Sequence, residues 1–544
     1  MGRIGKESVM MRTAIPDSGD LQMNHLSAKM THCLIEYCQQ SFFSETAMRT
    51  ILTFSVLILA FCIGCPQPAP VPNNVAPPPD ATVAEPDDAI SEPDVAGVEP
   101  EVVISEPDVA GVEPEVVISE PEGAGRVVSV VMADLGNLEL TFDSSWTIFG
   151  GPNRDGRSPE TGLLQSWSEG GPPLLWKAIG IGNTRDSGYS SVTVADGRVF
   201  TAGNVGDDAV YAYVFALDEA TGAEIWRYRN GPGWTNRNLY PGERSTPTID
   251  GDRVYVYSAV GRVACLDAAT GQEIWARDLR AEFNIQLPTW AFAESPYVDG
   301  NKVILWIGSE RAAVVALNKM TGETIWETPG NGMRAGYATM TAFDHGGQRM
   351  YVNTNQRGIL GVSAETGAQL FHIEHETAHD ILATTPYFFD GNLFFTSGYG
   401  AGARLYRLNV DGDTITPERV WANNFDNQHH GVVFKDGYAY GSIHGGRWMC
   451  VRLADGEIVW ENPGVRRGSI TYADGMLYCT SDGDRYVALV RATPEGYQEV
   501  SRFQLPDENE GGGVGIFWAH PVVVNQKLFL RHGNTLYCFD VAER

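Results

Sequence analysis

Eleven residues that lie directly before apolar runs have the side-chain types that bind small polar molecules. They are Tyr189, Arg244, Glu294, Tyr337, His379, Asp380, His429, His430, Arg467, Trp518 and His520. Guanidinium groups, carboxylates, imidazoles and aromatic rings gathered at one place would suit a polar, planar or anionic ligand. A polar, water-filled channel would need the same residue types to close it, so both interpretations stay open.

A second group of candidate ligands is less suggestive. His372, His375 and His379 alternate with Glu374 and Glu376 in a segment that leads from a predicted strand into a loop. Their spacing matches no compact zinc pattern, so we predict no metal site.

The charge balance excludes one class of function. The chain has 544 residues, of which 68 are acidic and 39 basic, and its formal net charge is -29. A protein that binds nucleic acid needs clustered Lys and Arg, so no nucleic-acid partner is expected. The 60 glycines, 13 tryptophans and 21 tyrosines favour an all-β repeat protein, because glycines make turns and aromatic residues favour strands.

The elements that must position the eleven residues repeat along the chain. Eight pairs of apolar runs are separated by short turn sequences, and Asp-Gly in such a place predicts a hairpin with a type I′ turn. The turns are expected at Asp196-Gly197, Asp250-Gly251, Asp299-Gly300, His345-Gly346, Asp390-Gly391, Asp436-Gly437, Asp474-Gly475 and Asn525-Gln526.

Each hairpin is followed by a third strand, a Thr-Gly turn or its degenerate equivalent, and an outer strand that carries an aromatic residue. The aromatic residues, which we expect to dock each blade on its neighbour, are Trp176, Trp226, Trp275, Trp326, Phe371, Trp421, Trp460 and Phe503. A period of about 45 residues with four strands per unit predicts propeller blades. The strand around Trp176 and the C-terminal strands would together form an eighth blade and close the ring. The expected fold is therefore an all-β, eight-bladed propeller over residues 146–544.

The repeat Ala216-Leu217-Asp218 to Trp226, with Thr221-Gly222 in its turn, resembles the repeats of the pyrroloquinoline quinone (PQQ)-like propellers. The opening segment 146–156, WTIFGGPNRDG, is similar to that of planctomycete-type lipoprotein members of the family. The resemblance implies one of two functions. One is a non-catalytic binding or scaffolding platform, and the other is a PQQ-dependent dehydrogenase that oxidises an alcohol or sugar.

Under the dehydrogenase alternative, the resemblance implies PQQ with calcium, with Arg467, Asp380 and Glu294 as candidate quinone, base and calcium residues. Family dehydrogenases also carry a pair of adjacent cysteines. The cysteines of the propeller, Cys265, Cys450, Cys479 and Cys538, are not neighbours in sequence. They lie in predicted strands, where a free cysteine acts as a small buried apolar residue, and a bridge between Cys450 and Cys479 or between Cys265 and Cys538 stays open. We therefore favour the platform.

The N-terminal part predicts an envelope protein. Residues 1–47 have the character of a mis-assigned extension, and residues 48–65 resemble a lipoprotein signal peptide whose 13-residue apolar run, 51–63, is short for a membrane span. Cys65 would then carry the lipid. Residues 66–125 have 14 acidic and no basic side chains and repeat the unit SEPDVAGVEPEVVI, which predicts a disordered acidic linker. Residues 126–145 would lead into the propeller.

We therefore expect a monomer on the periplasmic side of a bacterial cell envelope, held to the membrane by a lipid. The longer connections between blades, such as 227–244 and 276–293, lie on the propeller face opposite the short turns. Loops on a rigid scaffold carry most functional residues, so an envelope protein or a small polar ligand is expected to bind in a funnel on this face.

Overall fold

The computed structural model describes residues 129–132, 145–182, 188–206, 210–236, 239–505 and 516–544. The expected extension, signal peptide, Cys65 and linker, and most of the expected lead-in, lie outside these residues and stay predictions. Within the described residues, no helix is long and apolar enough to cross a membrane.

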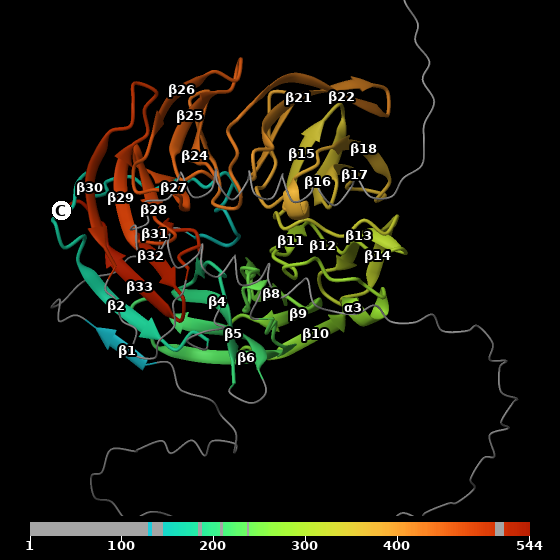
Figure 1. Ribbon diagram of the computed structural model, residues 1–544. Helices are drawn as coiled ribbons and strands as arrows, with labels where there is room; N and C mark the ends of the chain where they lie inside the picture. The colour runs from blue at the N-terminus through green and yellow to red at the C-terminus, as the bar shows by residue number, and fades with distance from the viewer. Residues whose placement is uncertain (1–128, 133–144, 183–187, 207–209, 237–238, 506–515) are drawn as a thin grey trace, which may run out of the picture. The chain divides into compact units, whose positions relative to one another are not determined.

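The described strands form eight antiparallel sheets arranged as the blades of a ring (Figure 1). The innermost strands are β3 (Thr193–Ala195), β7 (Thr248–Asp250), β11 (Tyr297–Asp299), β15 (Thr341–His345), β19 (Tyr387–Phe389), β23 (Val433–Lys435), β27 (Ile470–Ala473) and β31 (Val522–Val524). The second strands are β4 (Arg198–Val205), β8 (Arg253–Tyr257), β12 (Lys302–Trp306), β16 (Gln348–Asn355), β20 (Asn392–Ser397), β24 (Tyr438–Ser442), β28 (Met476–Thr480) and β32 (Lys527–His532).

The third strands are β5 (Tyr211–Asp218), β9 (Arg262–Asp267), β13 (Ala312–Asn318), β17 (Gly358–Ser363), β21 (Gly402–Asp411), β25 (Trp448–Arg452), β29 (Tyr486–Arg491) and β33 (Thr535–Asp540). The outer strands are β6 (Glu224–Pro232), β10 (Glu273–Asp278), β14 (Thr324–Pro329), β18 (Gln369–Glu374), β22 (Thr414–Asn423), β26 (Ile458–Asn462), β30 (Glu499–Gln504) and β2 (Leu174–Ile179). We number the blades 1 to 8 in this order. One helical turn, α3 (Leu279–Glu282), and one 3-10 turn, η2 (Ala378–Asp380), lie in the connections between blades.

The predicted eight-bladed propeller is confirmed, and so is the composition of its last blade. In blade 8, β2 from the N-terminal side pairs with β33 from the C-terminus, with Trp176 opposite Cys538. A further strand, β1 (Ser129–Met132), pairs with the outer edge of β2 and makes this sheet five-stranded. Closing the ring in this way removes the free edges that an open row of sheets would expose.

All eight expected hairpins form, but their turns are not all alike. At Asp196 and Gly197 both central residues have positive φ, 49° and 70°, as a type I′ turn requires. The predicted turn position is wrong at Asp250-Gly251, Asp299-Gly300 and His345-Gly346. There the first residue of the predicted turn is still paired as the last strand residue, as Asp250 is with Arg253, so each turn is shifted by one position and begins at the glycine.

The outer-strand tryptophans dock each blade on the next one. Trp176, for example, donates its indole N–H to the carbonyl of Glu219 at 3.0 Å, and Trp275 donates to the carbonyl of Lys319 at 3.0 Å. The indole of Trp275 also covers Gly322, whose φ is +77° and where an added Cβ would lie 2.7 Å from the ring. The Thr-Gly turn therefore needs glycine for two reasons: the positive φ, and the lack of room for a side chain under the indole ring.

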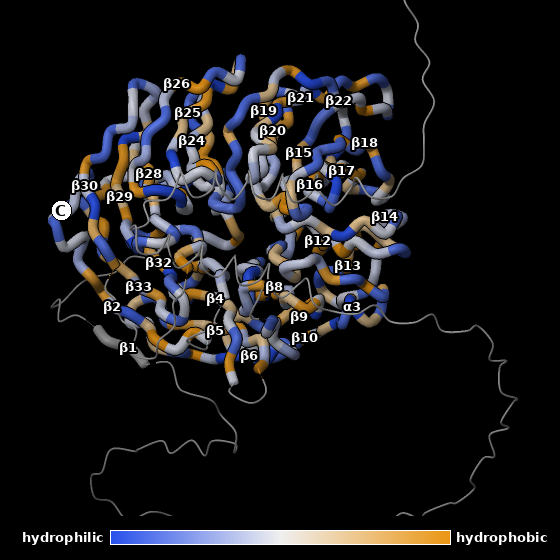
Figure 2. The backbone as a smooth tube through the Cα atoms, in the orientation of Figure 1, coloured by the Kyte–Doolittle hydropathy of each residue, from blue (hydrophilic) through white to orange (hydrophobic). Residues whose placement is uncertain are grey.

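The core is divided among the interfaces between blades. Apolar stretches colour many of the strands in Figure 2, and the buried residues form clusters that join neighbouring sheets, such as Trp275 and Trp306 in blades 2 and 3. Cys265, Cys450, Cys479 and Cys538 are buried and free, so neither of the two bridges left open by the sequence is formed. They act as small apolar core residues.

Candidate functional site: a funnel on the propeller axis

A cavity of about 480 Å³ opens on the face that carries the long connections. Eight of the eleven candidate residues line it, and each comes from the end of a connection that leads into an inner strand. They are Tyr189, Arg244, Tyr337, His379, His429, Arg467, Trp518 and His520. We call this cavity the funnel.

The other three candidates, Glu294, Asp380 and His430, do not line the funnel. In each case the residue just before does so: Ala293, His379 and His429. Neighbouring side chains of an extended chain point to opposite sides, which accounts for Glu294 and His430. Asp380 instead lies in the 3-10 turn η2, where His379 and Asp380 both have positive φ, 62° and 58°.

Glu294 is buried at the start of blade 3. One carboxylate oxygen accepts the backbone N–H of Trp306 at 2.8 Å and the other accepts the side-chain amide of Asn353 at 2.9 Å. Burial raises its pKa to about 8. Its oxygens are thus already occupied by the protein.

Asp380 and His430 also have partners in the protein. The Asp380 carboxylate lies 3.3 Å from Arg334 and accepts the amide of Gln356 at 2.8 Å. His430 is fully buried, with its imidazole 3.6 Å from Asp482, and burial lowers its pKa. Neither side chain is placed to meet a ligand in the funnel.

Two guanidinium groups face the funnel, and their surroundings differ. Arg467 donates to the carboxylate of Asp482 at 2.8 Å, so its charge is balanced. Arg244 donates to the backbone carbonyls of Gly242 (2.7 Å), Leu239 (3.1 Å) and Tyr240. Burial lowers the pKa of Arg244 to about 10, which leaves it charged at neutral pH.

Aromatic rings surround Trp518. The ring centroids of Tyr189, Tyr240 and His429 lie 4.8, 4.9 and 4.7 Å from that of Trp518, at interplanar angles of 43°, 55° and 70°. A second group on the wall includes Tyr399 and His444, whose centroids are 4.4 Å apart. Each of these rings has an apolar face and a polar atom, which suits contact with a ligand of mixed character.

Burial keeps two of the funnel histidines, His429 and His520, neutral. Burial lowers the pKa of His520 to about 4 and that of His429 well below its ordinary value. His520 contacts a backbone carbonyl, that of His429, at 3.1 Å. The imidazoles of His429 and His520 therefore serve as hydrogen-bonding groups and add no positive charge at neutral pH.

The sequence prediction missed several lining residues. They are Phe149, Leu239, Tyr240, Trp290, Ala293, Thr339, Ile381, Ala383, Tyr399, Gln428 and His444. Most lie within the long connections or in the loops between second and third strands, and not next to an inner strand. The concentration of aromatic residues in those loops, as at Tyr240 and Trp290, is the signal that could have identified them.

Phe149 belongs to a segment that crosses the propeller axis. Residues 146–156 bind inner strands on several sides of the ring. Trp146 bridges to Val194 of blade 1, Arg154 lies with its guanidinium carbon 3.7 Å from the ring centroid of Tyr297 in blade 3, and Gly156 accepts the N–H of Tyr472 in blade 7 at 2.9 Å. Because Phe149 packs on His520 at 4.9 Å, this segment forms the floor of the funnel.

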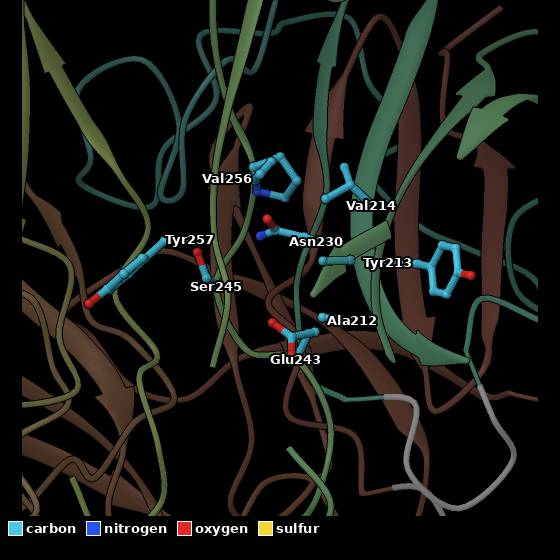
Figure 3. A pocket seen from close by; sticks show the side chains of 10 residues that line it. Ala212, Tyr213, Val214, Asn230, Glu243, Ser245, Val256 and Tyr257 are labelled. Atoms are coloured by element: carbon cyan, nitrogen blue, oxygen red, sulfur yellow. The ribbon is translucent and has the colours of Figure 1, made fainter. Parts of the chain in front are cut away.

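A much smaller cavity is lined by Glu243 and Ser245, the two residues that flank Arg244 in the chain. Asn230 and other residues also line it, and Figure 3 shows these side chains close together. Its volume of about 10 Å³ suits one water molecule. One oxygen of Glu243 accepts the N–H of Ala259 at 2.9 Å, and burial raises the Glu243 pKa to about 7.

The candidate histidine group does not converge. His375 contacts the hydroxyl of Ser397 at 2.7 Å, His372 contacts Asn355 at 3.2 Å, and His379 faces the funnel. Across the part of the chain that the structure describes, no three His, Cys, Asp or Glu side chains are grouped as metal ligands would be.

The funnel does not fit PQQ with calcium. Among the described residues, its lining contains no Asp or Glu to bind a hard cation. The candidate calcium residue Glu294 and the candidate base Asp380 both have protein partners. The rings around Trp518 are tilted at 43° to 70° and make no parallel-sided slot for a flat quinone.

Comparison with known proteins agrees with the repeat. A family model described as "Outer membrane protein assembly factor BamB" matches residues 210–462. The protein of that name from Moranella endobia is 25% identical over 283 residues, covering 49% of this chain and 69% of its own. A quinoprotein ethanol dehydrogenase from Pseudomonas putida is 28% identical over 146 residues, covering 26% of this chain and 22% of its own.

Among solved structures, a quinohemoprotein alcohol dehydrogenase from Pseudomonas putida aligns with a TM-score of 0.51 at 14% identity. The alignment covers 74% of this chain and 80% of that one, and at this identity it supports the fold alone. Together with the ring of four-stranded blades, these matches show that residues 210–462 are similar to the PQQ-like propeller repeats of BamB.

Proposed function

We propose that this protein is a non-catalytic binding or scaffolding platform of the bacterial cell envelope, and that the funnel face is its binding surface. The observation that carries the proposal is the funnel itself. It combines aromatic rings with a charged Arg244, while the carboxylates that could act as bases or ligands, Glu294 and Asp380, are held by other protein groups.

The setting of the platform is part of the proposal. Cys65 would carry a lipid, and the acidic linker 66–125 would let the propeller work at a distance from the periplasmic surface of the membrane. The BamB relatives are named as assembly factors for outer membrane proteins. We extend to this chain only the general role of holding another envelope component, and we propose that it acts as a monomer of the planctomycete-type lipoprotein group.

The first test addresses catalysis. PQQ and calcium are added to the purified full chain, and the reduction of an electron-accepting dye is followed with alcohols and sugars. We expect no turnover and no stoichiometric binding of the quinone. Turnover that depends on PQQ would overturn the proposal in favour of a dehydrogenase.

The second test addresses binding. Immobilised wild-type chain is exposed to detergent extract of the native envelope, beside the double variant Arg244→Met/Trp518→Ala. A matched control is Ile274→Ala, because Ile274 is 43% exposed on the outer strand of blade 2, away from the funnel. We expect the wild type and the control to retain the same envelope component and the double variant to lose it. Equal retention by all three proteins would show that the funnel is not the binding surface.

A further inference from the structure

The funnel carries a positive charge that no ion pair among the described residues balances. Its described lining contains Arg244 and Arg467 and no acidic side chain, although the whole chain has a net charge of -29. Asp482 neutralises Arg467. Arg244 forms no ion pair with a described residue. Beside it, Glu243 has its pKa raised to about 7, so that carboxyl is charged only in part at neutral pH.

Arg244 is held ready for a ligand. Its contacts with the carbonyls of Gly242, Leu239 and Tyr240 involve NH1 and NH2 and fix the plane of the guanidinium. A guanidinium has five N–H donors, so donors remain for a further acceptor. Because carbonyls satisfy hydrogen bonds without cancelling the charge, an anionic group is the partner that this site favours.

Two buried nitrogen atoms of the lining have no hydrogen-bond partner among the described protein groups. They are Nε1 of Trp518 and Nε2 of His429. An indole N–H can only donate, and a buried donor without an acceptor costs about 1–3 kcal/mol. Both atoms belong to the ring cluster at the centre of the funnel. A ligand hydroxyl would accept from the indole N–H, and a hydroxyl can pair with the imidazole nitrogen either as donor or as acceptor.

The rings of the funnel suit a puckered ligand better than a flat one. Tyr189 and Tyr240 meet Trp518 at 43° and 55°, and Trp290 meets Tyr337 at 69°. A flat polycyclic molecule needs parallel faces on both sides. A sugar ring has C–H faces that pack on tilted aromatic rings, and hydroxyl edges that reach the polar atoms of Tyr, Trp and His.

We propose that the funnel binds an anionic sugar, a mono- or disaccharide unit with a carboxylate or sulfate group. The anionic group would accept from Arg244, the sugar ring would pack on Trp518 and its neighbours, and a hydroxyl would accept from the Trp518 indole. The volume of about 480 Å³ lies within the range of about 300–1,000 Å³ of small-ligand sites. This inference rests on the proposed function, since it names the chemistry that the binding surface holds.

The test is calorimetric titration of the purified full chain with four probes. Methyl glucuronide carries a carboxylate, galactose 6-sulfate carries a sulfate, glucose is neutral, and benzoate is a flat anion. We expect one or both anionic sugars to bind more tightly than glucose and benzoate, and the tighter one identifies the anionic group. Similar binding of glucose and the acids, or binding of benzoate alone, would overturn the proposal.

Variants separate the two contacts. Arg244→Met should weaken binding of the anionic sugar by about 10- to 100-fold, the range for a lost charge-assisted hydrogen bond. It should leave the weak binding of glucose unchanged. Trp518→Phe, which keeps a ring and removes the N–H, should weaken the binding of both the anionic sugar and glucose. Arg280→Met is the matched control, because Arg280 is an exposed arginine on α3 outside the funnel and its loss should change neither affinity.

Thermal unfolding of each variant shows whether it is folded. If Arg244→Met unfolds early, it is replaced by Arg244→Lys, which keeps the charge and loses the planar donor pair. An affinity for anionic sugars that Arg244→Met leaves intact would overturn the proposal. If no sugar binds while the double variant still loses the envelope component, the sugar proposal fails and the platform stands. If retention is equal in all proteins of the extract experiment, the platform itself fails.

Discussion

A buried ion pair joins the last blade to the first, and its removal should destabilise the whole ring. Lys527 on β32 lies 2.7 Å from the carboxylate of Glu219, which follows β5. The two side chains are 2% and 0% exposed, and Asn525 donates a further hydrogen bond to the same carboxylate at 3.1 Å. The backbone carbonyl of Glu219 also accepts from the docking Trp176, so the pair lies at the closure itself.

The variant Lys527→Met leaves the Glu219 carboxylate buried with Asn525 as its main remaining donor. Removing one partner of a buried pair costs about 3–5 kcal/mol, because the other charge stays uncompensated. Replacing both charges should recover most of this loss. In the double variant Lys527→Met/Glu219→Gln, the amide oxygen can still accept from Asn525 and no charge is buried.

Urea unfolding followed by tryptophan fluorescence measures the effect. Arg466→Met is the control, since Arg466 is 78% exposed and its ion pair with Asp484 should contribute at most about 1 kcal/mol. We expect the single variant to be less stable than the control by about 3 kcal/mol or more, and the double variant to lie between them. A loss below about 1 kcal/mol in Lys527→Met, or a double variant no more stable than the single one, would refute this account of ring closure.

Two further predictions concern a docking turn and a buried acid. Gly322→Ala should destabilise the protein by more than Gly300→Ala, because only Gly322 lies under the ring of Trp275. Gly300 has positive φ but open space around it, so its replacement should cost about 1 kcal/mol. Equal midpoints of thermal unfolding for the two variants would contradict this prediction. Burial raises the Glu243 pKa from 4.5 to about 7, so the native state holds this proton more tightly, and the contribution of this carboxyl to stability should fall by about 3 kcal/mol as the pH rises from about 4.5 to 7. Glu243→Gln should remove that part of the pH dependence in urea unfolding, and an unchanged slope would rule out the assignment.

The fold was predictable because each blade is specified locally. A turn such as Asp196-Gly197 sets the hairpin, and an outer-strand residue such as Trp226 reports its docking on the next blade. The turns at Asp250, Asp299 and His345 differ from the prediction by one position, because the pairing of these residues with the next strand decides where each strand ends. Which residues pair across a hairpin depends on the surrounding sheet, so the turn dipeptide alone does not determine it.

The funnel was predictable to the extent that topology places the residues before each inner strand near the axis. Which of two neighbours faces the axis depends on the register of an irregular connection, and so His429 lines the funnel while His430 is buried beside Asp482. The positions of Tyr240 and Trp290 depend on loop conformations that have no repeat. Sequence periodicity therefore predicts where the site lies. Which side chains face it, and so which ligand it could bind, depends on side-chain directions that only the structure shows.

The segment that crosses the axis determines what kind of site the funnel can be. An open channel would let solvent and ligands pass through the disc, but Phe149, packed on His520, and the partly buried Arg154, packed on Tyr297, lie in this path. A closed floor makes every ligand enter and leave on the face of the long connections. Because the floor rests on His520, which in turn contacts the backbone of His429, it bears on the same ring cluster that would hold the ligand. The depth of the funnel is thus fixed by eleven residues that belong to no blade, and a change there should alter binding while the eight blades remain intact.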